Sequence, residues 1–146
     1  MYFVEWIGDN SVELTQVVSI ICLLHINAYL ILAYIIGFLI NTKINNILKK
    51  WLDPFTTSGH FQKIFYSLVF VGLLLYKTNK LSLYWRYITG VFVIAGITCL
   101  YNCLVHQYHT IPEIVVGSGI GTLVGYSAAW LSGVIVVSFS QNASIK

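Results

Sequence analysis

Charged side chains are scarce in this sequence. Asp, Glu, Lys and Arg together make up 9% of its 146 residues, whereas hydrophobic residues make up 58%. A soluble domain usually carries about 25% charged residues, so this chain has too few charges to cover a water-facing surface, which argues against a soluble monomeric globule. Intrinsic disorder requires low hydrophobicity and high charge, and it is excluded as well. The net charge of +3 is too small and too scattered to indicate nucleic acid as a partner.

Arginine and cysteine are also rare. Arg86 is the only arginine in the chain. Its three cysteines, Cys22, Cys99 and Cys103, lie in apolar stretches without C-x-x-C spacing, which does not indicate a zinc site. We expect the cysteines to act as small apolar filler, and we expect no metal and no cofactor.

The sequence does contain long hydrophobic runs, and these predict an all-α fold: a polytopic membrane helix bundle of about four transmembrane helices. A helix rises about 1.5 Å per residue, so some 20 apolar residues cross the roughly 30 Å hydrocarbon core. Backbone in lipid must satisfy its own hydrogen bonds, which helices do. We find no linker and no repeat, so residues 1–146 are predicted to form a single membrane domain, with transmembrane helices at about 14–42, 58–76, 84–105 and 111–139.

Four antiparallel helices would place the first loop, residues 41–60, and the third loop, residues 106–112, on the same side of the membrane. Most of the polar residues that could take part in catalysis or binding lie in these two loops. The last span carries Gly117, Gly121 and Gly125 at four-residue spacing, together with Gly119. Such a stripe of small residues predicts that another helix packs closely against it.

The first loop and its flanks combine lysines with a helix start. Lys43, Lys49 and Lys50 precede Thr57 and Ser58, either of which is a good N-cap for the next helix. A helix N-terminus offers free N–H groups and suits a phosphate. The alternative is a basic juxtamembrane loop that contacts lipid headgroups.

The third loop places a carboxylate four residues after a histidine. Glu113 can accept a hydrogen bond from one nitrogen of His109 and raise the basicity of the other, as in a nucleophile–base arrangement. Alternatively, Glu113 is an acid stabilised by the helix dipole, with His109 merely interfacial. His106 competes with His109 as a candidate. His25 lies mid-span in the predicted first helix, where we favour an interhelical hydrogen bond.

Taken together, the two loops predict a site for phosphoryl transfer. One of two histidines on the same membrane face, His60 and His109, would attack phosphorus, and the other would protonate the leaving oxygen. Lysines and backbone N–H groups would balance the charge on the phosphate oxygens.

These residues resemble the type 2 phosphatidic acid phosphatase superfamily, and most closely its dolichyl diphosphatase branch. The string Thr57-Ser58-Gly59-His60 is similar to the family's Pro-Ser-Gly/Ser-His motif. The string from Asn102 to Glu113 is similar to its Ser-Arg-x5-His-x3-acid motif, and it contains the Tyr108-His109-Thr110 signature of that branch. The resemblance covers about residues 40–131.

The resemblance implies a metal-independent lipid phosphatase that hydrolyses a polyprenyl or dolichyl type of lipid phosphate or diphosphate in the endoplasmic reticulum membrane. His109 would be the nucleophile that forms a phosphohistidine, His60 the acid for the leaving group, and Glu113 the orienting acid. Ser58 and Gly59 would hold phosphate oxygens, as would lysines of the first motif.

The sequence departs from the family pattern at several positions. The first motif, Lys-x6-Arg-Pro, matches either Lys43 with Lys50 or, by the Asn-rich helix before it, Lys49 alone. Thr57 replaces a proline, and Cys103 replaces the arginine of the third motif. Lysine is no equivalent of a bidentate guanidinium. An active minimal enzyme therefore competes with a non-catalytic protein that binds phosphorylated lipid, and with an unrelated structural or pore-forming membrane protein.

The orientation follows from the second loop, which is flanked by Lys77, Lys80 and Arg86. If this loop is cytoplasmic, the site faces the lumen or exterior. Four spans would put the Asn142-Ala143-Ser144 acceptor sequence on the same side as the first residues of the chain.

Overall fold

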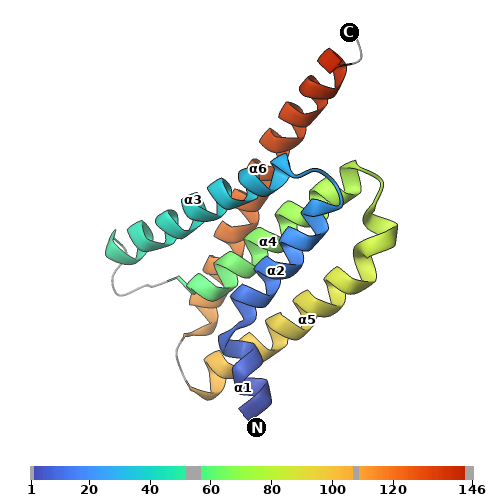
Figure 1. Cartoon of the computed structure of the whole chain (residues 1–146). Helices are drawn as coiled ribbons and strands as arrows, with labels where there is room; N and C mark the ends of the chain where they lie inside the picture. The colour runs from blue at the N-terminus through green and yellow to red at the C-terminus, as the bar shows by residue number, and fades with distance from the viewer. Residues whose placement is uncertain (1, 52–56, 107–108, 144–146) are drawn as a thin grey trace.

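The computed structural model describes residues 2–51, 57–106 and 109–143, without the side chains of Tyr2, Leu81 and residues 134–143. Within these residues the chain forms six helices and no strand (Figure 1). Gln107 and Tyr108, which belong to the third predicted motif, lie outside the described residues. The helices are α1 (Tyr2–Asp9), α2 (Ser11–Leu24), α3 (Tyr29–Trp51), α4 (Gly59–Lys77), α5 (Leu81–Val105) and α6 (Ile111–Ala143). The prediction of an all-α bundle is confirmed.

The prediction of one helix over residues 14–42 is wrong, because the chain turns at His25–Ala28 between α2 and α3. A continuous helix of that length would measure about 43 Å, well beyond the hydrocarbon core. Polar side chains contact backbone groups at the end of α2 and at the start of α3. His25 Nδ1 lies 2.8 Å from the Ile21 carbonyl oxygen, and Asn27 Oδ1 accepts a hydrogen bond from the Tyr29 N–H at 2.9 Å. His25 is therefore a turn residue and not a mid-span one.

The other predicted boundaries lie close to the observed ones. α4 begins at Gly59 with Ser58 at its N-cap position, although the Ser58 side chain makes no capping hydrogen bond. The Ser58 N–H donates instead to the Glu113 carbonyl oxygen at 3.1 Å, which ties the start of α4 to the start of α6.

Four helices have the length and apolarity needed to cross a membrane. They are the segments Tyr29–Trp51, Gly59–Lys77, Ser82–Val105 and Ile111–Gly133. The segments Phe3–Asp9 and Ser11–Leu24, which meet at a 65° bend, pass the same test only as a pair and would make a fifth span. These properties are those of an integral, multi-pass membrane protein.

Successive helices from α2 to α6 run in alternating directions (Figure 1). Consequently α1, the end of α3, the start of α4, the end of α5 and the start of α6 gather at one end of the bundle, here called the site end. The last turns of α6 extend from the opposite end. Because the first predicted span is two antiparallel helices, α1 and the end of α6 lie at opposite ends, contrary to the arrangement that four spans predicted.

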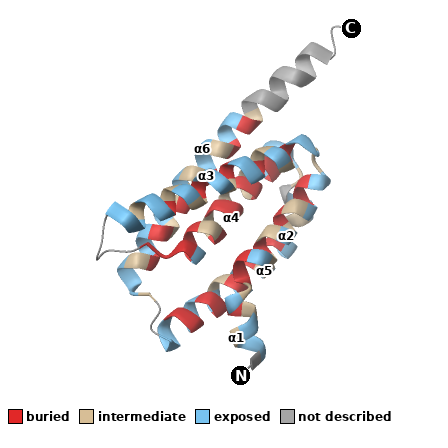
Figure 2. Ribbon diagram, turned by 60° about the vertical axis from the view of Figure 1, so that its left-hand side comes forward, coloured by how far each residue is buried: buried red, intermediate tan, exposed pale blue. Residues whose placement is uncertain are grey.

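α4 is the central helix, and its seam with α6 depends on glycine. An added Cβ at Gly117, Gly121 or Gly125 would collide with the α4 backbone at Ser58, Gln62 or Tyr66, respectively. The predicted close packing at this stripe is thus confirmed. Figure 2 shows buried residues concentrated where the helices face one another, with exposed residues on the outer faces.

Buried polar contacts join α3 to α4. Gln62 Nε2 donates to the backbone oxygen and to Oδ1 of Asn41, both at 2.9 Å. Thr57 Oγ1 donates to Asn45 Oδ1 at 2.5 Å. All four side chains are buried, so these bonds fix the start of α4 against the last turns of α3.

Candidate functional site

A small pocket of about 170 Å³ lies at the site end of the bundle. His60 from the first turn of α4 and His109 from the segment before α6 both line it. The two histidines are 49 positions apart in the sequence, and the folding of α4, α5 and α6 brings them together. The remaining lining residues come from α1 and α5, and they are Gly8, Asp9, Cys99, Asn102 and Cys103.

Glu113 in the first turn of α6 contacts both His109 and the helix start. Its Oε2 lies 3.5 Å from His109 Nδ1, within ion-pair distance. The same oxygen accepts a hydrogen bond from the Thr110 N–H at 2.8 Å. Glu113 thus serves the helix start through a hydrogen bond, whereas the hydrogen bond predicted between it and His109 is not formed and only the ion-pair distance remains. Its contact leaves Nε2 as the nitrogen of His109 that is free of the carboxylate.

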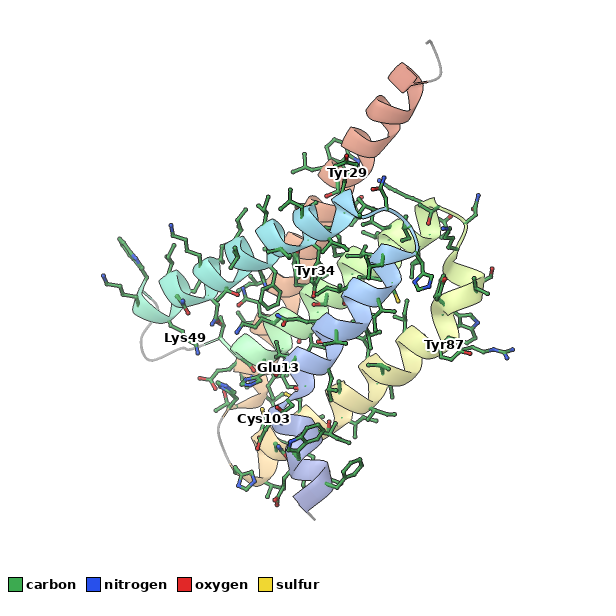
Figure 3. The ribbon with its side chains drawn as sticks, viewed as in Figure 1. Glu13, Tyr29, Tyr34, Lys49, Tyr87 and Cys103 are labelled. Carbon is green, nitrogen blue, oxygen red and sulfur yellow. The ribbon has the colours of Figure 1, made fainter. Side chains whose placement is uncertain are left out.

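The electrostatic environment of His60 is mixed. The charged groups around this imidazole include Lys63, Glu13 and Lys49, and also His109 when it is protonated. Glu13 is an exposed residue of α2, so the carboxylate reaches the site end from a helix that was expected to lie elsewhere. Figure 3 shows Lys49, Glu13 and Cys103 at the same end of the molecule, on three different helices.

The predicted lysines do not line the pocket. Lys43, Lys49 and Lys50 are exposed on the last three turns of α3, and the described lining contains no lysine side chain. Of the three, Lys49 is the one whose charge acts on His60. α3 meets α4 through Asn41 and Asn45. Lys49 lies one turn beyond Asn45 on the same face of α3, whereas Lys43 and Lys50 lie on other faces.

Ser58 and Gly59 lie buried beside the pocket rather than in its described lining. The Ser58 N–H is already bonded to Glu113, so it is not available to a phosphate. Gly59 is packed against the Asn45 amide, where an added Cβ would come within 2.9 Å of Nδ2. These two residues set the position of His60 through the backbone.

Asp9 and Asn102 are lining residues that sequence reasoning missed. Asn102 Nδ2 donates to Asp9 Oδ1 and to the Glu5 carbonyl oxygen, both at 2.9 Å, which fastens α1 to α5. Gly8 permits this approach, because a Cβ there would overlap the Asn102 amide. In the sequence, Glu5, Asp9 and Glu13 recur every four residues, which would put three carboxylates on one face of a helix. A single first span placed these acids on the opposite side of the membrane from the histidines, so the spacing was not connected with the site.

Asn102 Oδ1 is a buried lining atom without a hydrogen-bond partner among the described residues, and the buried His109 Nδ1 has only its 3.5 Å ion-pair contact with Glu113. Buried polar atoms normally have partners. The pocket therefore suits a polar ligand or water. Cys99 and Cys103 form its apolar side, with both thiols buried and reduced.

The other two histidines lie outside the pocket lining. His106 is the exposed C-cap residue of α5. His25 lies at the opposite end, where its ring contacts Tyr84 at 5.6 Å and its backbone oxygen accepts a hydrogen bond from Lys80 Nζ. Among the described residues, no group of three His, Cys, Asp or Glu side chains is placed to hold a metal ion.

The comparisons with known proteins return no match: no family model, no curated protein and no solved structure is similar to this chain.

Proposed function

We propose that this protein is an integral membrane lipid phosphatase, which hydrolyses a lipid-linked phosphate or diphosphate of the polyprenyl or dolichyl type through a phosphohistidine intermediate. The observation that supports this most is that His60 and His109, from separate helices, line one pocket at the end of an apolar bundle. Such a position lets a lipid keep its chain in the bilayer while its phosphate enters the pocket. We place the protein in the endoplasmic reticulum membrane with the site on the lumenal side.

The proposed reaction has two steps. In the first, His109 Nε2 attacks phosphorus, the bond to the leaving oxygen breaks, and protonated His60 gives its proton to that oxygen. In the second, water attacks the phosphohistidine, neutral His60 takes a proton from the water, and the P–N bond breaks to release inorganic phosphate. Glu113, 3.5 Å from His109 Nδ1, stabilises the positive charge that this ring acquires.

The charges around the pocket favour an anion only in part. Lys49 and Lys63 act on His60 and would attract a phosphate. Asp9 in the lining opposes an anion, although its Oδ1 is engaged by Asn102. Because the lysines are on α3 and α4 and Asp9 is on α1, a bound phosphate should place its oxygens toward α3 and α4 and away from α1.

Direct measurement of phosphate release tests the proposal. The purified protein in detergent, with a chelator present, is expected to release phosphate from a polyprenyl monophosphate or diphosphate, and His109→Ala should abolish this release. His106→Ala is the matched control, because it removes a nearby imidazole that does not line the pocket, and it should keep full activity. Release that survives His109→Ala would exclude the assigned nucleophile.

A second candidate function is binding of a phosphorylated lipid without turnover. Cys103 lines the pocket at the position where the resembled family has an arginine. Arg86, the only arginine of the chain, lies near the start of α5, away from the site end, so it does not replace that arginine. A transition-state arginine can contribute on the order of 10³-fold or more to the rate. If the wild type binds lipid phosphate but releases none, Cys103→Arg should restore release and the uncharged Cys103→Met should not.

A further inference from the structure

A larger apolar cavity of about 510 Å³ lies between α4 and α5, separate from the histidine pocket. Phe61 and Ile64 of α4 and Phe92 of α5 are buried and form its floor. Val93 and Ile97 of α5 form part of its rim and are 50% and 63% exposed. The cavity is thus a groove in the outer face of the bundle, within two helices that are long and apolar enough to lie in the bilayer.

The groove and the histidine pocket are lined by the same turns of α4 and α5, on different sides of these helices. On α4, Phe61 of the groove directly follows His60 of the pocket. On α5, Leu100 of the groove directly follows Cys99 of the pocket. Consecutive residues of a helix point about 100° apart, so a ligand whose polar part occupies the pocket would have to pass around one side chain of α4 or α5 to enter the groove at the same level.

The length of the groove sets how much of a ligand it can hold. Its lining on α5 extends from Leu100 to Thr89, a distance of about 16 Å at the rise of an α-helix. This is about half of the roughly 30 Å hydrocarbon core. A chain that follows the groove from the site end leaves it near the middle of the bilayer.

We infer that the groove between α4 and α5 binds the first part of the hydrocarbon chain of a lipid whose phosphate-bearing head occupies the pocket of His60 and His109. This inference rests on the proposed function and specifies its substrate: a lipid with an unbranched or isoprenoid chain next to the phosphate. Chain atoms beyond the groove remain in the bilayer, so chain length beyond about half a bilayer adds nothing to recognition.

Gly96 provides a sharp test, because it lines the groove and a Cβ added there meets nothing within 4 Å. Gly96→Leu should fill the groove without a clash. Gly90→Leu is the matched control: Gly90 is also on α5, also has open space, and does not line the groove. Thermal unfolding of each variant in detergent should match the wild type.

The substrates compared are a long-chain polyprenyl phosphate and a water-soluble phosphate ester with a short alkyl chain. Gly96→Leu should lower kcat/KM for the long-chain substrate by about tenfold or more, the loss expected when about two methylene groups leave an apolar site. It should leave the soluble ester unaffected, and Gly90→Leu should change neither. An equal loss on both substrates, or no loss on either, would overturn the inference.

A binding experiment separates failure of the groove from failure of the proposed function. If the wild type releases no phosphate, a polyprenyl phosphate with a photoreactive group on its first isoprene unit should still crosslink to Phe61–Ile64 or to the facing part of α5. Gly96→Leu should suppress this crosslink. Labelling spread over all outer faces, or crosslinks between two copies of the chain at this groove, would contradict the assignment.

Discussion

At the scale of single residues, Oε2 of Glu113 accepts the Thr110 N–H at 2.8 Å and lies 3.5 Å from His109 Nδ1. Glutamine at this position keeps an oxygen for the Thr110 N–H but has no negative charge for the imidazole. We therefore expect Glu113→Gln to fold normally and to lower phosphate release on the order of 10²-fold, a typical contribution for acid–base machinery. Steady-state turnover and thermal unfolding, measured together, check this.

The prediction holds only if turnover falls while the unfolding temperature stays unchanged. A Glu113→Gln protein with a lowered unfolding temperature and proportionally lowered activity would show that the carboxylate serves only the helix start. Full activity with normal stability would show that it does not act on His109.

At the scale of helices, the α4–α6 seam rests on glycines whose Cβ positions are occupied by backbone. Gly121→Ala places a methyl group against the Gln62 backbone, which cannot move without shifting α4. Overpacking of this kind costs about 1–3 kcal/mol. Gly119→Ala lies two residues away with nothing within 4 Å, and alanine is the better helix former there.

Thermal unfolding in detergent distinguishes the two variants. We expect a lower unfolding temperature for Gly121→Ala and an unchanged or slightly higher one for Gly119→Ala. Equal effects would mean that helix propensity, and not contact between α4 and α6, governs this seam. Because Ser58 lies against the same stripe, Gly117→Ala should also displace the start of α4 and reduce activity.

At the scale of the whole molecule, α1 and the end of α3 lie at the site end, whereas the α4–α5 turn lies at the other (Figure 1). Single cysteines introduced at Phe3 or Trp51 should react with a membrane-impermeant thiol reagent from one side of sealed vesicles. A cysteine at Thr78 should react only from the other side. The native cysteines are buried and serve as an internal blank.

Labelling of Phe3→Cys and Thr78→Cys from the same side would contradict the arrangement of α1 and α2. The Asn142-Ala143-Ser144 sequence gives a second measurement. The end of α6 lies opposite the site end, so Asn142 should carry no glycan if the site is lumenal.

Much of the site could be found in the sequence because its signals are local. Glu113 is in the first turn of α6 and His109 lies just before that helix, four positions away, so their contact is local in the sequence. Ser58, two positions before His60, is suited to an N-cap, and this predicted the start of α4 to within one position. Asp9 and Asn102 could not be found in this way, because their hydrogen bond depends on where α1 lies relative to α5.

The amino-acid sequence by itself determined that this chain is an all-α protein with helices fit for a bilayer, because a backbone in lipid must bond to itself and hydropathy is readable residue by residue. It also predicted that another helix packs closely against the three glycines on one face of the last helix, and the fold made that partner α4. Only the tertiary structure decided that the first hydrophobic run turns back at His25–Ala28. A run too long for one span can tilt or fold, and the choice depends on packing of α2 against α4 and α5, which brings Asp9 to the histidines.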